Sequence, residues 1–406
     1  MKKIILLLIG VALSSQSYAQ SVDYREKATK LVAKMTLEEK ASLCSGETAW
    51  STKAIARLGI PSIFMTDGPH GLRKAVGFDF TNSVPATCFP TASAVASSWN
   101  PALAQKMGEA LGIESQANDV QILLGPGVNM KRSPLGGRNF EYFSEDPILA
   151  GTIATGYING VQSQGVGTSI KHFAANSQET ERMSNSSNVD ERTLNEIYFP
   201  AFEMAVKNAQ PWTVMCSYNK LNGVYASENG YLLTQTLKDK WGLKGFVVSD
   251  WGAVNERVAG VDAGLNLEMP ASGGFNDKKI VEAVKKGTLS EARLDQIVTE
   301  LLAVTLKAKD SHKKGIVVDK VKHNELARQV SGECIVLLKN DNAILPLKSS
   351  LKKIAIVGDF AKNPRYQGAG SSQVRPTQIL NALTELQKLA KGTEFSFSSG
   401  YNTAGD

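Results

Sequence analysis

Short apolar runs alternate with longer amphipathic stretches along most of this chain. The apolar runs have strand length and mostly end in glycine or polar residues; they lie at residues 60–65, 120–124, 166–170, 212–216, 246–248 and 265–267. Between most of them, apolar positions recur with helical spacing. Strands that alternate with helices are typical of a parallel sheet, so the pattern predicts an α/β fold.

Several helices can be placed from their apolar faces and caps. They are expected at residues 23–43, 190–208, 276–286 and 290–307. A capping box at residues 36–39 predicts that the first of them restarts there. Pro200 interrupts the second, and should kink it or require a local adjustment.

The number of strands favours a closed (β/α)8 TIM-like barrel over residues 20–310. An open dinucleotide-binding sheet fits less well, because no strand precedes a G-x-G-x-x-G motif with an acidic residue about 20 positions later. Residues 311–325 are polar and basic, which predicts a linker. Residues 326–406 add further strands at 353–357 and 395–397, as expected for the start of an α/β sandwich domain that is truncated at Asp406.

The N-terminus has the pattern of a signal peptide over residues 1–19. Two lysines precede an apolar run at residues 4–13, and small residues flank a cut before Gln20. This predicts export to the periplasm or the extracellular space. There is no cysteine at that cut and no later apolar stretch long enough to cross a bilayer, so we expect no membrane anchor.

Composition limits the kinds of partner. The 406 residues are 42% hydrophobic and 21% charged, as in a globular protein, and removing Lys2 and Lys3 lowers the formal charge from +6 to +4. Interleaved Lys and Glu indicate a solvated surface, so we expect no nucleic-acid partner. The four cysteines lack paired spacing, which argues against a disulfide framework, and Cys216 is typical of a buried thiol. The four histidines are scattered, so we expect no metal and no cofactor.

Polar side chains follow several of the predicted strands. In a barrel the carboxyl ends of the strands share one rim, so these side chains are expected to converge: Asp67, Lys171, His172, Tyr218 and Asp250. Asp250 ends an apolar strand, and Trp251 beside it offers an aromatic face for a sugar ring. Taken alone, Asp250 fits equally well as the N-cap of the next helix.

These strand-end motifs together resemble glycoside hydrolase family 3, of the β-glucosidase and β-xylosidase type. The motifs are TDGPHGLR at residues 66–73, GGRNFEYFSEDP at 136–147, KHFAAN at 171–176 with Arg182, VMCSYNKLNG at 214–223 and VSDW at 248–251. The resemblance covers nearly the whole mature chain. It implies a (β/α)8-like barrel followed by an α/β sandwich, which agrees with the boundary inferred above.

The resemblance implies a retaining, exo-acting β-glucosidase with Asp250 as nucleophile. Nearby cations or hydrogen-bond donors should keep Asp250 ionised. Asp67 would accept sugar hydroxyls, and Arg138, Lys171, His172 and Arg182 would donate to them. Tyr218 and Met215 would lie near the nucleophile, and GAGSS at residues 368–372 matches a loop of the second domain whose Ser371 or Ser372 could touch the sugar.

Structural roles are the alternatives at these positions. Asp67 also fits a simple turn, His172 a buried, satisfied histidine, and Tyr218 and Met215 plain packing. Arg138 and Arg182 could pair with Glu141, Glu145 or Glu179. We interpret Arg132, Glu141 and Glu145 as structural, and Glu268 as a rival second carboxylate.

The resemblance places the acid/base Glu of two-domain members beyond Asp406. Single-domain members use an Asp–His pair in the loop after the Lys-His strand, but residues 176–190 contain no histidine. We therefore expect weak turnover of ordinary glucosides, with activated aryl glucosides affected least. The ligand would be a β-glucoside or oligosaccharide, and the oligomeric state is left open. A β-xylosidase, another β-glycosidase of the family, or a non-catalytic sugar-binding protein are the alternatives.

Overall fold

The computed structural model describes residues 22–77 and 79–403, and its main sheet is the curled wall of a barrel. Parallel strands form it in the order β1-β5-β6-β8-β11. Their bounds are β1 (Met65–Asp67), β5 (Ile122–Leu124), β6 (Gly167–Phe173), β8 (Thr213–Cys216) and β11 (Phe246–Ser249). Every residue in these strands is buried, as expected for a parallel sheet covered on both faces. Five of the six predicted strands are present, but the first is shifted, because β1 begins at Met65, the last residue of the apolar run at 60–65.

Isolated bridges continue the ring from β11 back to β1. They pair Val248 with Leu267, Glu268 with Ser45, Gly46 with Thr52 and Ser51 with Phe64, directly before β1. The predicted strand at residues 265–267 is reduced to one such bridge, because the Asn266 side chain accepts the Val247 N–H at 2.8 Å in place of a backbone carbonyl. The chain has an α/β, TIM-like fold, as predicted.

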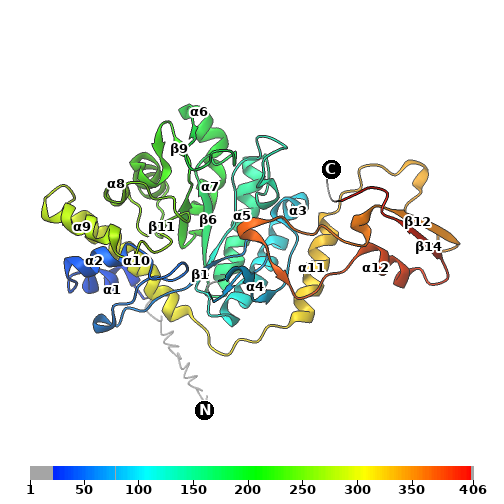
Figure 1. The fold of residues 1–406 in the computed structure, drawn as a ribbon, viewed down its shortest axis with the longest axis horizontal. Helices are drawn as coiled ribbons and strands as arrows, with labels where there is room; N and C mark the ends of the chain where they lie inside the picture. The colour runs from blue at the N-terminus through cyan, green and yellow to red at the C-terminus, as the bar shows by residue number, and fades with distance from the viewer. Residues whose placement is uncertain (1–21, 78, 404–406) are drawn as a thin grey trace, which may run out of the picture.

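Helices surround this sheet (Figure 1). They are α1 (Tyr24–Val32), α2 (Leu37–Leu43), α3 (Ala92–Ser97), α4 (Pro101–Ala117), α5 (Pro147–Ser163), α7 (Pro200–Ala209), α8 (Arg257–Ala263), α9 (Phe275–Lys285) and α10 (Glu291–Ser311). The predicted restart is confirmed, because Thr36 and Glu39 form a capping box at the start of α2. Short strands form two further small sheets, one of β2 (Ala75–Val76) with β3 (Asp79–Ser83) and one of β7 (Ser186–Ser187), β9 (Lys220–Leu221) and β10 (Val224–Tyr225).

The local adjustment expected at Pro200 is a π-helical segment. The predicted helix at residues 190–208 consists of α6 (Glu191–Thr193), the π-helical η3 (Leu194–Tyr198) and α7, which begins with Pro200. Proline has no N–H to donate, so the first position of a new helix tolerates it well.

Glycines allow α4 and α5 to pack backbone to backbone. A Cβ on Gly160 would lie 2.1 Å from the Gln105 carbonyl oxygen, and one on Gly108 would lie 2.4 Å from that of Tyr157. Neither carbonyl can rotate away without moving its helix. The glycines of α4 and α5 therefore determine how closely the two helices approach.

We expect Gly160→Ala to lower the free energy of unfolding by about 3 kcal/mol, because the added methyl overpacks this crossing. Urea unfolding followed by circular dichroism measures it. The matched control is Asn159→Ala, an exposed neighbour on α5 that should change stability by less than about 0.5 kcal/mol. Equal unfolding midpoints for the two variants would contradict the packing argument.

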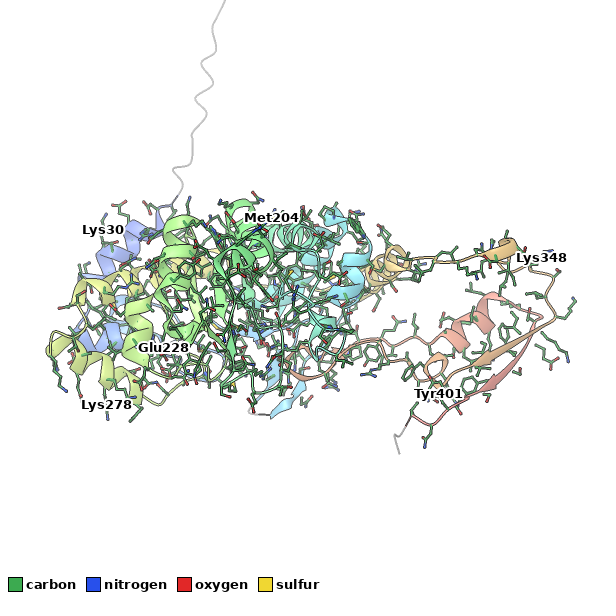
Figure 2. The ribbon with its side chains drawn as sticks, turned by 90° about the horizontal axis from the view of Figure 1, so that it is seen from above. Lys30, Met204, Glu228, Lys278, Lys348 and Tyr401 are labelled. Carbon is green, nitrogen blue, oxygen red and sulfur yellow. The ribbon has the colours of Figure 1, made fainter. Side chains whose placement is uncertain are left out.

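After α11 (Lys320–Cys334), which packs against the barrel, the parts of the C-terminal segment at residues 353–357 and 382–398 lie to one side of the barrel (Figure 1). Within the predicted linker, only residues 312–319 are outside a helix. The two predicted strands are present as β12 (Lys353–Val357) and β14 (Glu394–Ser398), which pair in parallel beside α12 (Ala382–Leu389). Figure 2 shows Lys278 of α9 and Lys348 towards opposite ends of the long axis.

Contacts at α11 and at a short strand tie this segment to the barrel. In α11, His323 Nδ1 lies 2.8 Å from Glu114 Oε1 of α4, and both side chains are buried. The strand β13 (Arg375–Pro376) pairs in parallel with β4 (Pro85–Ala86) of the barrel. Residues just before β13 are thereby brought to the rim of the barrel.

Three sequence-based expectations concern features other than the barrel. The predicted signal peptide, residues 1–19, lies outside the described residues. Among residues 22–77 and 79–403, no helix has the length and apolarity to span a membrane. All four cysteines are free thiols, and Cys216 is fully buried, as predicted.

Candidate active site

A cavity of about 780 Å³ lies where the barrel strands end. All the predicted site residues line it: Asp67, Arg138, Lys171, His172, Arg182, Met215, Tyr218, Asp250 and Trp251. They come from different strands and loops, so the fold brings together what the sequence separates.

Asp250 follows β11 directly, and only 8% of it is exposed. Its Oδ1 accepts the Trp251 N–H at 2.7 Å, and its Oδ2 lies 3.5 Å from His172 Nε2. Burial raises the pKa of Asp250 above its ordinary value, and the nearby charges of Arg138 and Lys171 oppose this shift. The expected cations are present, but burial outweighs them. Asp250 does not cap the next helix, because the N-cap of α8 is Glu256.

His172 is buried and neutral. Burial, followed by the charges of Arg138 and Lys171, lowers the pKa of His172 well below its ordinary value. Arg138 Nη2 lies 3.1 Å from Nε2, and the Tyr142 hydroxyl lies 3.1 Å from Nδ1. An arginine can only donate, so Nε2 is the acceptor and Nδ1 carries the proton. His172 lines the cavity, and its expected contact with a sugar hydroxyl stays a prediction.

Asp67 ends β1, between two cations. Its Oδ1 lies 3.8 Å from Lys171 Nζ, and its Oδ2 lies 3.4 Å from Arg73 Nη1. Burial raises the pKa of Asp67 to about 6, against the opposing effect of these two cations. Both contacts are long for charge-assisted hydrogen bonds, so the carboxylate retains capacity to accept hydroxyl donors.

Glu141, interpreted from the sequence as structural, lines the cavity. It ends the helical turn η2 (Asn139–Glu141) and forms ion pairs with both Arg138 and Lys171. The alternative that Arg138 and Arg182 pair with nearby glutamates is confirmed: Arg138 pairs with Glu141, and Arg182 Nη1 lies 2.6 Å from Glu179 Oε2. The structural interpretation was incomplete, because a turn of irregular backbone places the Glu141 carboxylate against the cavity.

Stacked side chains form one wall of the cavity. The Arg182 guanidinium lies 4.7 Å from the centre of the Tyr218 ring, and the Tyr218 hydroxyl donates to the Trp251 carbonyl at 3.0 Å. Trp251 Nε1 donates to the Ala49 carbonyl at 2.8 Å, which fixes the indole. Its ring centroid lies 5.2 Å from that of Trp50. This fixed aromatic surface beside Asp250 suits the apolar face of a sugar ring.

A loop from the C-terminal segment completes the cavity. Its lining residues are Arg365, Gln367, Gly368, Ala369, Gly370 and Ser371. Ser371, not Ser372, faces the cavity: Ser372 is fully buried, and its hydroxyl donates to the Ala369 carbonyl. The Gln367 side chain forms two hydrogen bonds with the backbone of Val374, which brace the loop.

Sequence reasoning missed several lining residues: Trp50, Arg73, Phe140, Glu141, Glu179, Arg365 and Gln367. Arg73 closes the 66–73 motif and could have been found there. Trp50 and Arg365 lie in loops that no periodic pattern marks. Glu268, the rival carboxylate, is outside the lining and accepts hydrogen bonds from Asn276 and Ser272.

No group of three or more His, Cys, Asp or Glu side chains within residues 22–77 and 79–403 is arranged to hold a metal ion. The cavity is lined by carboxylates, by guanidinium and ammonium groups, and by aromatic rings. This set can accept and donate hydrogen bonds around a polyhydroxylated ring.

Comparison with known proteins shows which family this chain resembles. Residues 28–304 match the glycosyl hydrolase family 3 N-terminal domain, and residues 335–404 match the family 3 C-terminal domain. A thermostable β-glucosidase B of Acetivibrio thermocellus is 58% identical over 383 residues, which are 93% of this chain and 50% of that protein. An exo-α-(1→6)-L-arabinopyranosidase of Bifidobacterium longum is 50% identical over 91% of this chain and 50% of its own length.

A solved structure has a closely similar fold. The family 3 β-glucosidase of Bifidobacterium adolescentis superposes with a TM-score of 0.86 at 50% identity, over 91% of this chain and 53% of that one. The chain spans about half the length of the curated relatives it matches. Both domain models match in order along the sequence, and together they cover most of it. The chain belongs to glycosyl hydrolase family 3.

Proposed function

We propose that this chain supplies the nucleophile and the sugar pocket of an exo-acting β-glucosidase that retains the anomeric configuration. The observation that carries the proposal is Asp250, a buried carboxylate at the end of a barrel strand, within a cavity lined by hydroxyl-binding groups. The β-glucosidases among the relatives support glucose as the sugar. Asp67 and Lys171 would hold its hydroxyls, and Trp251 would support its ring.

In this proposal, Asp250 Oδ2 attacks the anomeric carbon. A bond forms between that oxygen and the anomeric carbon, while the bond from this carbon to the leaving oxygen breaks. The leaving oxygen takes a proton from an acid. Water then attacks the anomeric carbon of the glycosyl–Asp250 ester and gives a proton to the conjugate base of that acid, which releases the sugar and restores the carboxylate. Arg138 and Lys171 stabilise Asp250 as an anion whenever it is free.

We propose that the acid comes from outside these 406 residues. The carboxylates that line the cavity are Asp67, Glu141, Glu179 and Asp250. Glu141 has a pKa lowered to about 2 by Lys171 and Arg138, so it holds no proton to give. Glu179 is paired with Arg182, and Asp67 is assigned to the sugar hydroxyls.

Product stereochemistry tests the proposed function. With 2,4-dinitrophenyl β-D-glucoside, whose leaving group needs no proton, proton NMR should show β-glucose as the first product, before mutarotation. First formation of α-glucose would contradict retention. Binding of glucose without any turnover of this substrate would favour a non-catalytic sugar-binding protein.

The arabinopyranosidase relative favours a second sugar specificity. Dinitrophenyl β-D-glucoside, β-D-xyloside and α-L-arabinopyranoside should be compared by kcat/KM under one condition. We expect the glucoside to react fastest. A faster pentoside would reassign the sugar while leaving the role of Asp250 intact.

We also propose that the protein is exported, on the basis of the N-terminal pattern in residues 1–19. Expression with the native N-terminus, followed by N-terminal sequencing, should find a chain beginning at Gln20. Recovery of an uncleaved chain beginning at Met1 would contradict this proposal.

Glucose affinity should fall as the pH drops through about 6. Asp67 is expected to bind hydroxyls as an anion, and its pKa of about 6 places its protonation in that range. If only the ionised form binds, Kd rises about tenfold per pH unit below that value. Calorimetric titration with glucose measures the dependence. In Asp67→Asn, which cannot ionise, this dependence should disappear; an unchanged profile would contradict the assignment.

A further inference from the structure

Glu141 is a buried carboxylate that the proposed mechanism does not use. Only 1% of it is exposed. Its Oε2 accepts from Arg138 Nε at 2.8 Å and lies 2.7 Å from Arg138 Nη2, while its Oε1 lies 3.1 Å from Lys171 Nζ. One carboxylate thus engages two of the cations that line the cavity.

The same two cations also face the carboxylates assigned to substrate. Lys171 Nζ is closer to Glu141, at 3.1 Å, than to Asp67, at 3.8 Å. Arg138 directs its short contacts at Glu141 and at His172 Nε2, while its charge acts on Asp250 from further away. Glu141 therefore competes with Asp67 for Lys171 and with Asp250 for Arg138.

We propose that Glu141 is a positioning residue that holds Lys171 and Arg138 back from Asp67 and Asp250, leaving both carboxylates free to engage the sugar. The inference rests on the proposed function, because it assigns Asp67 and Asp250 to the substrate. Without Glu141, Lys171 would close on Asp67 and Arg138 on Asp250. A carboxylate satisfied by a tight ion pair is a poorer acceptor for hydroxyls and a weaker nucleophile.

The charges around Asp67 determine the direction of the effect. Arg73 faces it from the loop after β1, Lys171 from β6, Glu141 from η2 and Asp250 from the end of β11. The two cations lower the pKa of Asp67, and the two carboxylates raise it. Removing the Glu141 charge therefore lowers the pKa of Asp67 for two reasons. One repulsive negative charge is lost, and Lys171 becomes free to move towards Asp67.

The direct test is a carboxyl carbon-13 NMR titration of Asp67 in the full chain, selectively labelled at aspartate. Asp67→Asn identifies the resonance. In Glu141→Gln, which keeps the shape of the side chain and removes its charge, the Asp67 midpoint should fall by at least about one pH unit from about 6. The matched control is Glu145→Gln, an exposed carboxylate of the same segment outside the cavity lining, which should leave the midpoint unchanged.

A second readout follows the chemistry of Asp250. Trapping by 2-deoxy-2-fluoro-β-D-glucosyl fluoride needs no acid, because fluoride leaves without a proton. In Glu141→Gln we expect the trapping rate at saturation to fall at least about tenfold and the acidic limb of its pH profile to move to lower pH. Glu141→Asp, which keeps the charge on a shorter side chain, should recover part of both effects.

The two readouts separate the possible failures. If the wild type is trapped and Glu141→Gln leaves both the Asp67 midpoint and the pH profile unchanged, the positioning role is overturned and the proposed function stands. If the wild type is not trapped, the proposed function is wrong, and an unchanged Asp67 midpoint would overturn the charge competition as well. Should Glu141→Gln not fold, Glu141→Asp decides, since a midpoint equal to that of the wild type would contradict competition for Lys171.

Discussion

Asp250→Ala is expected to lower the hydrolysis of 2,4-dinitrophenyl β-D-glucoside by about 10⁴-fold or more, the largest effect of any single substitution in this site. The variant keeps the cavity but loses the oxygen that attacks the anomeric carbon. The dinitrophenolate leaving group of this substrate needs no acid, so the fall in rate reports on the nucleophile alone. Initial rates of dinitrophenolate release measure it.

Azide provides the decisive control for Asp250→Ala. A small anion can enter the space left by the carboxylate, attack from the same face and yield α-glucosyl azide, which restores part of the rate. Asp262→Ala, at an exposed position of α8, is the matched substitution and should retain wild-type activity. A residual rate in Asp250→Ala within about tenfold of the wild type would mean that another group attacks the sugar.

Asp67→Ala is expected to lower kcat/KM by about 10²–10⁴-fold. Two charge-assisted hydrogen bonds to sugar hydroxyls are lost, each contributing roughly 1.5–3 kcal/mol, and Lys171 and Arg73 lose a shared carboxylate. Because binding energy remote from the reacting bond also helps to reach the transition state, kcat should fall as well as KM rise. Steady-state kinetics with the dinitrophenyl glucoside separates the two constants.

The control for Asp67→Ala is Asp119→Ala, which removes a carboxylate whose side chain is 79% exposed. It should leave both constants within about twofold of the wild type. An effect of Asp67→Ala on KM alone would show that its contacts are equal in the ground state and the transition state. Wild-type constants in this variant would remove Asp67 from the sugar pocket.

The strand ends could be predicted from the sequence because a polar side chain follows several of the apolar runs there. An apolar run such as residues 246–248 marks a buried strand, and the polar side chain that follows it must reach the common rim of the barrel. The sequence therefore predicts that Asp250 and Asp67 lie on the same rim, and both line the cavity. The predicted strand at residues 265–267 failed for a reason that periodicity cannot show, namely a ladder hydrogen bond taken by the Asn266 side chain.

The remaining site residues depend on tertiary contacts that leave no local signal. Glu141 lies in a turn, and its function follows only from its distances to Arg138 and Lys171. Gln367 and Gly368 reach the cavity because β13 pairs with β4, residues nearly three hundred positions away. A Cβ on Gly368 would lie 2.3 Å from the Phe140 ring, so a close backbone approach completes the pocket.

The most direct test of the proposed site is to locate the covalent intermediate. The chain should be incubated with 2-deoxy-2-fluoro-β-D-glucosyl fluoride, weighed intact by mass spectrometry, digested and mapped. We expect one fluoroglucosyl group per chain, attached to the Asp250 carboxylate and absent from Asp250→Ala. An unlabelled, folded chain, or a label on Asp67, Glu141 or Glu179, would contradict it.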